Sequence, residues 1–319
     1  MRPRSGPDGD GQRGAGELAV PVPFSMAEFG ACLEERTGRA AMLIPVAMAP
    51  GVPSGIFVQT GGADYLFYEE QTSPFHQAHI VVSLAAHAVL DDLAGPCIDR
   101  RLVPDVSPQL LRMMLGDDAR IATVTQAGAE TFAFVALDRA GVAACPTDLA
   151  RHLLREVGPL HSALLGAVPE ASAGAACGCA VTGGAGDDAG LRLYQRVIEI
   201  REAMLALRPW RDPDVATAAS VAGLAGLAGD ELAAKVEAAV LAAAVRARNA
   251  GHPVRRPAGD GGCLWVAGPD LRSEADWLVQ VSRAFAQVPV AGGPVGGEVL
   301  GGRPEGGGLE AGTGAEGLR

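Results

Sequence analysis

The stretch from Tyr68 to Asp92 constrains the fold more than any other part of the chain. It begins like the end of a strand. Ser73-Pro74 is then typical of a helix start, because serine caps free N–H groups and proline suits the first helical position. Apolar residues follow at helical spacing and form a candidate buried stripe: Phe75, Ala78, Val82, Ala85, Ala86 and Val89. The pattern predicts one long amphipathic helix.

Short elements surround this helix in the first half of the chain. Ser25 can cap a helix that runs to about Thr37. Apolar runs predict strands over 41–45, 55–60 and 65–68. Gly61-Gly62 indicates that the last two strands form a hairpin. Further along, Ser107-Pro108 predicts a short helix through Leu115, and residues 121–138 have a helical pattern. These elements predict an α+β domain, a small sheet with helices, over residues 23–140.

The second half of the chain has only helical patterns. The predicted helices are 147–168, 191–207, one that begins at Asp212-Pro213, 230–248 and 273–287, the last with Ser273 and Asp276 as a capping box. We therefore expect an all-α domain over 147–290. Residues 1–22 and the Gly-rich tail 291–319 should be disordered, because they cannot bury enough apolar surface to offset their chain entropy.

Charge and composition exclude some function classes. The chain has 37 acidic and 26 basic residues, a net charge of -11. That balance argues against direct nucleic-acid binding and against general binding to anionic membranes, which both need a cationic face. No run approaches the roughly 18–20 strongly apolar residues that cross a bilayer. The six cysteines are scattered and no secretory segment is visible, so we expect reduced thiols and a cytoplasmic location.

The long helix has the frame of a zinc-peptidase helix without most of its chemistry. In H-E-x-x-H, two histidines one turn apart bind zinc, and the glutamate between them polarises the bound water. His87 occupies the second histidine position here. Ser83 stands at the first, and Leu84 stands where the glutamate should be. The motif is written S-L-A-A-H, which predicts that no zinc binds and that the chain is not an enzyme.

The residues before this motif, YEEQTSPFHQAHI, resemble the lead-in of ImmA/IrrE-type metallopeptidase domains. More narrowly, they are similar to the ParH-like toxin-component proteins of actinobacterial gene clusters. The matching residues are Thr72, His76, Gln77, His79, Ile80 and His87. Glu130 is matched with the acidic third ligand of that family. The resemblance covers about residues 23–138 and implies a degenerate peptidase domain in which Ser83, Leu84, His87 and Glu130 are the remnant of the motif.

Other metal-binding or catalytic arrangements use the same helix. His76 and His79, three residues apart, can chelate a metal displaced from the ancestral position. His79 and His87 cannot share one metal, because they lie about 12 Å apart along a helix axis. Ser83 and His87 have the spacing of a nucleophile and its base, but no orienting acid is identifiable. The alternative interpretation of His76 and His79 is that they cap and pack the start of the helix.

A second block, LRLYQRVIEIREAMLALRPWRDPDV, begins at Leu191. It resembles the signature of an actinobacterial domain of unknown function that usually follows a multi-helix membrane region in transporter-type proteins. The resemblance extends from about Leu149 to Pro289, and the membrane region is absent. Arg196, Glu199, Arg201 and Arg208 are candidate docking residues for a partner or a small anionic ligand. The alternative is a solvated helix face with pairs such as Arg196 with Glu199.

Three functional hypotheses follow. The first is a non-catalytic regulatory or protein-interaction protein of a toxin–antitoxin-like gene cluster. By resemblance, its partner is a helix-turn-helix regulator or another cluster component. The second is a metal-dependent peptidase with a displaced or incomplete zinc site. A third hypothesis, a peripheral membrane regulator that has lost its own spans, is disfavoured by the acidic charge.

Overall fold

A computed structural model describes residues 18–89, 120–123, 129–172, 188–223, 227, 229–252 and 268–288. The predicted tail 291–319, most of the predicted disordered N-terminus and the predicted helix 107–115 lie outside these residues. Leu18, within the segment predicted to be disordered, is buried against the core. The described residues belong to one compact unit.

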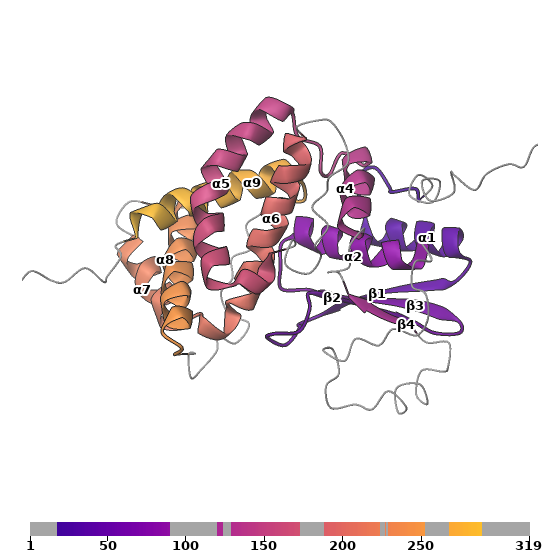
Figure 1. Cartoon of the computed structure of the whole chain (residues 1–319), viewed down its shortest axis with the longest axis horizontal. Coiled ribbons are helices and arrows are strands. Elements are labelled where there is room, and N and C mark those ends of the chain that lie inside the picture. Colours follow the sequence, from indigo (N-terminus) through magenta and orange to yellow (C-terminus); the bar gives the residue numbers. More distant parts are fainter. Residues whose placement is uncertain are drawn as a thin grey trace, which may run out of the picture. The chain divides into compact units, whose positions relative to one another are not determined.

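The N-terminal part contains a four-stranded sheet with the order β1-β3-β2-β4 (Figure 1). Its strands are β1 (Ala40–Val46), β2 (Gly55–Gln59), β3 (Ala63–Glu69) and β4 (Arg120–Thr123). β1 runs parallel to β3, whereas β2 is antiparallel to both of its neighbours. The hairpin predicted at Gly61-Gly62 is confirmed, because Gln59 pairs with Asp64 across it.

Helices α1 (Met26–Thr37) and α2 (Pro74–Val89) cover one face of this sheet (Figure 1). Both predicted starts are confirmed. The Ser25 side chain accepts a hydrogen bond from the Glu28 N–H, and the Ser73 hydroxyl accepts one from the His76 N–H at 3.2 Å. The core between these layers includes Phe29 and Leu33 of α1 and Phe57 and Leu66 of the sheet, all fully buried.

α2 is not amphipathic, which corrects the sequence-based prediction. Every residue from Phe75 to His87 except Gln77 is buried. The physical reason is that α2 has neighbours on several sides: β2 and β3, then α1, α4 (Ala129–Arg139) and α6 (Ala189–Ala206). Polar residues of α2 therefore lie in protein contacts rather than in solvent.

The helix predicted over 121–138 is also partly wrong. Residues 120–123 form the edge strand β4, with Ile121 opposite Val58 of β2, and the helix α4 begins only at Ala129. Strand pairing with β2 overrides the local helical pattern, as tertiary context often does for short apolar segments.

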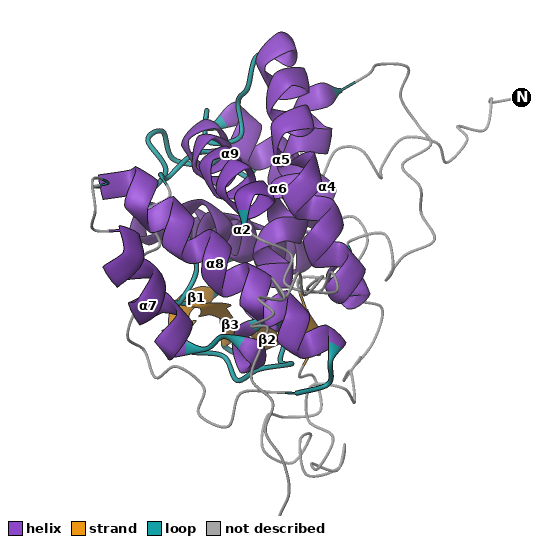
Figure 2. Cartoon of the chain, turned by 90° about the vertical axis from the view of Figure 1, so that its left-hand side faces the viewer, coloured by secondary structure: helices purple, strands orange, loops and turns teal. Residues whose placement is uncertain are grey.

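The second half is helical, as predicted (Figure 2). Its helices are α5 (Thr147–Ala167), α6, α7 (Pro213–Gly223), α8 (Gly229–Asn249) and α9 (Leu271–Gln287), with 3-10 turns η1 (Pro169–Ala171) and η2 (Arg208–Trp210). The capping box of α9 lies three residues earlier than predicted: Asp270 is the N-cap and Ser273 its partner. None of the described helices has both the length and the apolar character required to cross a bilayer.

Candidate functional site

A cluster of polar side chains, most of them buried, lies where α2 of the sheet-containing part meets α6 of the helical part. We call it the α2–α6 cluster, and its members are Ser54, Thr72, His76, His79, Tyr194 and Glu202. Ser54 and Thr72 come from loops beside the sheet, the two histidines from α2, and Tyr194 and Glu202 from α6. The cluster therefore joins residues that are more than a hundred positions apart in the sequence.

His76 is fully buried and uses both ring nitrogens. Its Nε2 lies 3.1 Å from Glu202 Oε1, and its Nδ1 lies 2.8 Å from Thr72 Oγ1. Because a carboxylate only accepts, Nε2 carries the proton, and in the neutral ring Nδ1 accepts the Thr72 hydroxyl proton. A hydroxyl, an imidazole and a carboxylate in series resemble a nucleophile, base and acid. Thr72, however, is only 3% exposed, which closes it to a substrate.

His79 is held by Tyr194. Its Nδ1 lies 2.5 Å from the Tyr194 hydroxyl, and the two rings meet edge to face with centroids 5.5 Å apart. Burial, together with the nearby His76, holds the pKa of His79 well below the ordinary histidine value. His79 is therefore neutral at pH 7 and serves as a packed hydrogen-bonding group.

Glu202 is the acidic member of the cluster and is partly exposed. Burial raises the pKa of its carboxyl group. This effect is outweighed by the hydrogen bond and charge of His76, the Ser54 hydroxyl and the nearby Arg208, so the pKa of Glu202 is lowered overall. Ser54 and His76 both bond to the same oxygen, Oε1. The carboxylate thus connects the sheet-containing part to the helical part in its charged form.

His87, which the resemblance matches with the second zinc ligand, makes contacts within the fold. His87 Nε2 donates to the Thr123 carbonyl oxygen at 3.0 Å, and its ring packs against Phe57. Burial lowers the pKa of His87, and the bond to Thr123 partly opposes that shift. Ser83 and Leu84 are fully buried. Glu130 is the second residue of α4, and its matching with the acidic ligand stays a prediction.

The three histidines of α2 do not form a metal-binding group with their neighbours. The rings of His76 and His79 lie nearly parallel with centroids 5.8 Å apart. Their hydrogen-bonded nitrogens point to different partners: Thr72 and Glu202 for His76, Tyr194 for His79. Within the described ranges, no three histidine, cysteine or carboxylate side chains gather as metal ligands would.

The charged residues of α6 also make internal contacts. Arg196 donates to the Leu154 carbonyl of α5 at 3.4 Å. Glu199 binds His161 of α5 at 2.7 Å and accepts from Ser172 at 3.3 Å. Both side chains are partly buried. Both residues therefore bond to neighbouring parts of the helical half while staying partly exposed, because α5 packs beside α6 along this side.

Arg201 and Arg208 extend from α6 and η2 into the fold. Arg201 is fully buried and forms an ion pair with Glu274 of α9, which is equally buried. Arg208 binds Glu69 of β3 at 2.8 Å and the Gln71 carbonyl at 2.9 Å. A partner cannot reach Arg201 in this structure, so its prediction as a docking residue is not supported by its position. Arg196 and Arg208 keep partial exposure.

Three members of the cluster, Ser54, Tyr194 and Glu202, were not identified from the sequence as site residues. Tyr194 and Glu202 are eight residues apart on α6, a spacing that places both on one helix face. That spacing was a usable signal for a common contact surface. Ser54 lies in a turn and has no local pattern that marks it. Its role depends on the approach of α6, which is visible only in the folded chain.

Comparison with known proteins identifies only the second half of the chain. No curated protein and no solved structure matches the chain. No peptidase family is found for the first half. Residues 147–287 match a family model described as "Family of unknown function (DUF6545)", so this region is similar to that family, as the VIEIR block predicts.

Proposed function

We propose that the chain is a non-catalytic regulatory protein that acts by binding other proteins. In this proposal α2 is a structural helix of peptidase type that has lost its reaction. The observation that carries the proposal is the use of its histidines: His76, His79 and His87 all bond to groups of the fold. Ser83 and Leu84 stand where a ligand and a base would be needed.

The partner class comes from resemblance. The lead-in TSPFHQAHI is similar to that of ImmA/IrrE-type, ParH-like proteins, whose gene clusters have toxin–antitoxin character. We therefore propose a helix-turn-helix regulator or another component of such a cluster as the partner. The family of residues 147–287 has no known function and supports neither choice.

A zinc measurement tests the loss of catalysis. The full-length protein, purified without added metal, is analysed for zinc beside His87→Ala and His76→Ala variants. The proposal expects far less than one zinc per chain in all three. Stoichiometric zinc in the wild type that is lost in His87→Ala would overturn it. An apparent peptidase activity that survives in both variants would be a contaminant.

A displaced metal site on His76 and His79 is the second candidate, because their rings lie side by side on α2 with centroids 5.8 Å apart. It predicts stoichiometric zinc that is lost in His76→Ala and retained in His87→Ala. The two candidates therefore give different patterns across the same three proteins.

A further inference from the structure

β1 is one of the two edge strands of the sheet, the other being β4. In the described part of the chain, no strand pairs with β1 on the side away from β3. The Glu70 N–H donates to the Val46 carbonyl at 3.1 Å, so Val46 bonds toward β3. Successive residues of a strand bond to opposite sides, so Ala41, Leu43 and Pro45 direct their backbone groups outward. Such an edge is a template for pairing with another chain.

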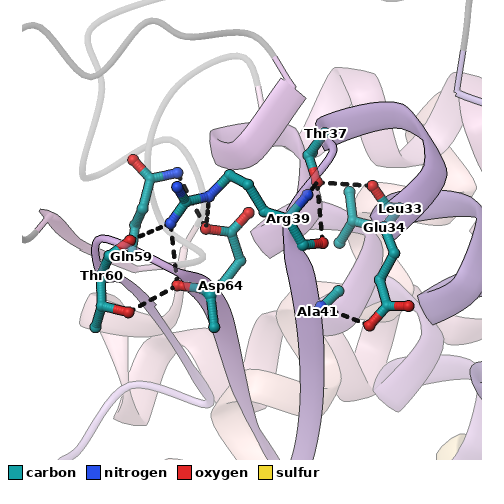
Figure 3. Close-up of polar contacts among 9 residues, drawn as sticks. Leu33, Glu34, Thr37, Arg39, Ala41, Gln59, Thr60 and Asp64 are labelled. Atoms are coloured by element: carbon teal, nitrogen blue, oxygen red, sulfur yellow. Dashed lines mark hydrogen bonds and ion pairs between the residues drawn. The ribbon is translucent and has the colours of Figure 1, made fainter.

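Two side chains limit this edge. Glu34, from the last part of α1, accepts the outward N–H of Ala41 at 2.9 Å (Figure 3). Pro45 has no N–H and cannot donate to a neighbouring strand. Of the three outward positions, Leu43 alone keeps an N–H that neither feature blocks. Charged side chains and prolines at a sheet edge are known to oppose the addition of another strand.

We infer that Glu34 and Pro45 prevent β1 from pairing edge to edge with a second copy of this chain. A second copy is the occupant that the strand geometry fits. Two antiparallel β1 strands centred on Leu43 would set Leu43 opposite itself and Ala41 opposite Pro45 of the second copy. A strand that pairs with itself about a twofold axis needs no separate complementary sequence.

Glu34 and Pro45 each reduce the number of backbone hydrogen bonds that this pairing could form. The Leu43 pair would exchange two bonds. Each Ala41–Pro45 pair would make one bond, from the Ala41 N–H, and only after Glu34 had released it. A residue other than proline at position 45 would add a second bond to each of these pairs. Met42, 47% exposed on the neighbouring position, would add apolar contact between the copies.

Sedimentation velocity over a range of protein concentrations tests the inference. The test variant is Glu34→Ala/Pro45→Val. The matched control is Glu35→Ala/Pro45→Val. Glu35 is the next residue of α1 and is exposed, so its replacement removes the same charge without changing the contact with Ala41. We expect a concentration-dependent dimer for the test variant. The control should associate at least about tenfold less tightly, since its Ala41 N–H groups remain engaged.

The inference is overturned if the test variant and its control associate equally, or if the wild type already dimerises through β1. Should the double variant not fold, amide hydrogen exchange on the single variants gives the answer. Exchange at Ala41 should be about tenfold faster in Glu34→Ala than in Glu35→Ala, because the N–H loses its acceptor. Equal rates would show that Glu34 does not protect the edge.

Discussion

At the scale of single residues, Ser83 is a buried polar residue of α2 whose side chain lacks a partner in the described part of the chain. Its hydroxyl group is fully buried and has no hydrogen-bond partner among the described residues. A buried hydroxyl without a partner costs stability, because it gives up its bonds to water. His79 and His87, one turn before and after it, both have partners. Ser83 is therefore the one polar residue of this stripe that contributes nothing by bonding.

Ser83→Ala should raise the free energy of unfolding by about 1 kcal/mol, since it removes an unsatisfied hydroxyl and little volume. Urea denaturation at pH 7 measures this change. Ala86→Ser is the matched control: position 86 is equally buried on the same helix, so a new hydroxyl there should lower stability. A loss of stability in Ser83→Ala would contradict this prediction, because it would mean that the Ser83 hydroxyl makes a stabilising hydrogen bond.

The histidines predict the pH dependence. The pKa of His79 is lowered by burial, so between that value and about 6.5 the unfolded chain binds a proton that the folded chain does not. His87 acts in the same direction. The free energy of unfolding should therefore fall as the pH is lowered from 7 to 5. At more acidic pH, protonation of Glu202, whose pKa is lowered, should reduce it further.

Denaturant titrations at pH 7 and pH 5 measure this loss, with His79→Gln beside the wild type. The variant lacks the buried imidazole, so its stability should change less between the two pH values. Equal changes in the two proteins would show that His79 does not titrate on unfolding.

At the scale of elements, local sequence signals predict starts and turns well. Ser25, Ser73-Pro74 and Gly61-Gly62 act through their own neighbours, and the structure has the expected elements at each. The burial of a whole helix or strand is harder to predict, because it depends on distant parts of the chain. The apolar stripe of α2 gives no sign that its polar residues are also buried, because α4 and α6 cover them from distant parts of the chain. For the same reason, β4 depends on its pairing with β2.

One polar contact set connects α1 and β1 to the β2–β3 hairpin (Figure 3). Arg39 follows Gly38, whose positive φ of 67° ends α1. The Arg39 guanidinium binds Asp64 Oδ1 at 2.8 Å and also contacts the Thr60 carbonyl and, at 3.2 Å, the Ala63 carbonyl. Asp64 is fully buried, and Gln59 also bonds to it. Arg39 thus supplies the positive charge that a buried carboxylate requires.

Arg39→Ala should lower the free energy of unfolding by about 3 kcal/mol, because it leaves the Asp64 charge buried without compensation. Arg39→Ala/Asp64→Asn should recover part of that loss, since the uncompensated charge is gone. Guanidinium denaturation of the three proteins measures both effects. A loss in the double variant as large as in the single variant would assign the effect to lost packing instead.

At the scale of the whole molecule, the described residues form one unit in which the sheet-containing part meets the helical part at α2 and α6. The all-α second half and the α+β first half follow from residue patterns. The contact between them does not, because it depends on pairs such as His76 with Glu202 and His79 with Tyr194. Glu69 with Arg208 adds a third link. Glu202 and Arg208 of the charged second block serve this contact. Arg196, Glu199 and Arg201 bond within the helical half instead.

The most direct test of this account is a double-mutant cycle on His79 and Tyr194, using His79→Ala, Tyr194→Phe and the combination. The account predicts a coupling free energy of at least about 1 kcal/mol in the unfolding of the full-length protein, since the bond is buried and joins both halves. The exposed pair Arg272–Asp276, 3.9 Å apart within α9, is the control and should give about zero. A His79–Tyr194 coupling no larger than that of the control would contradict the account.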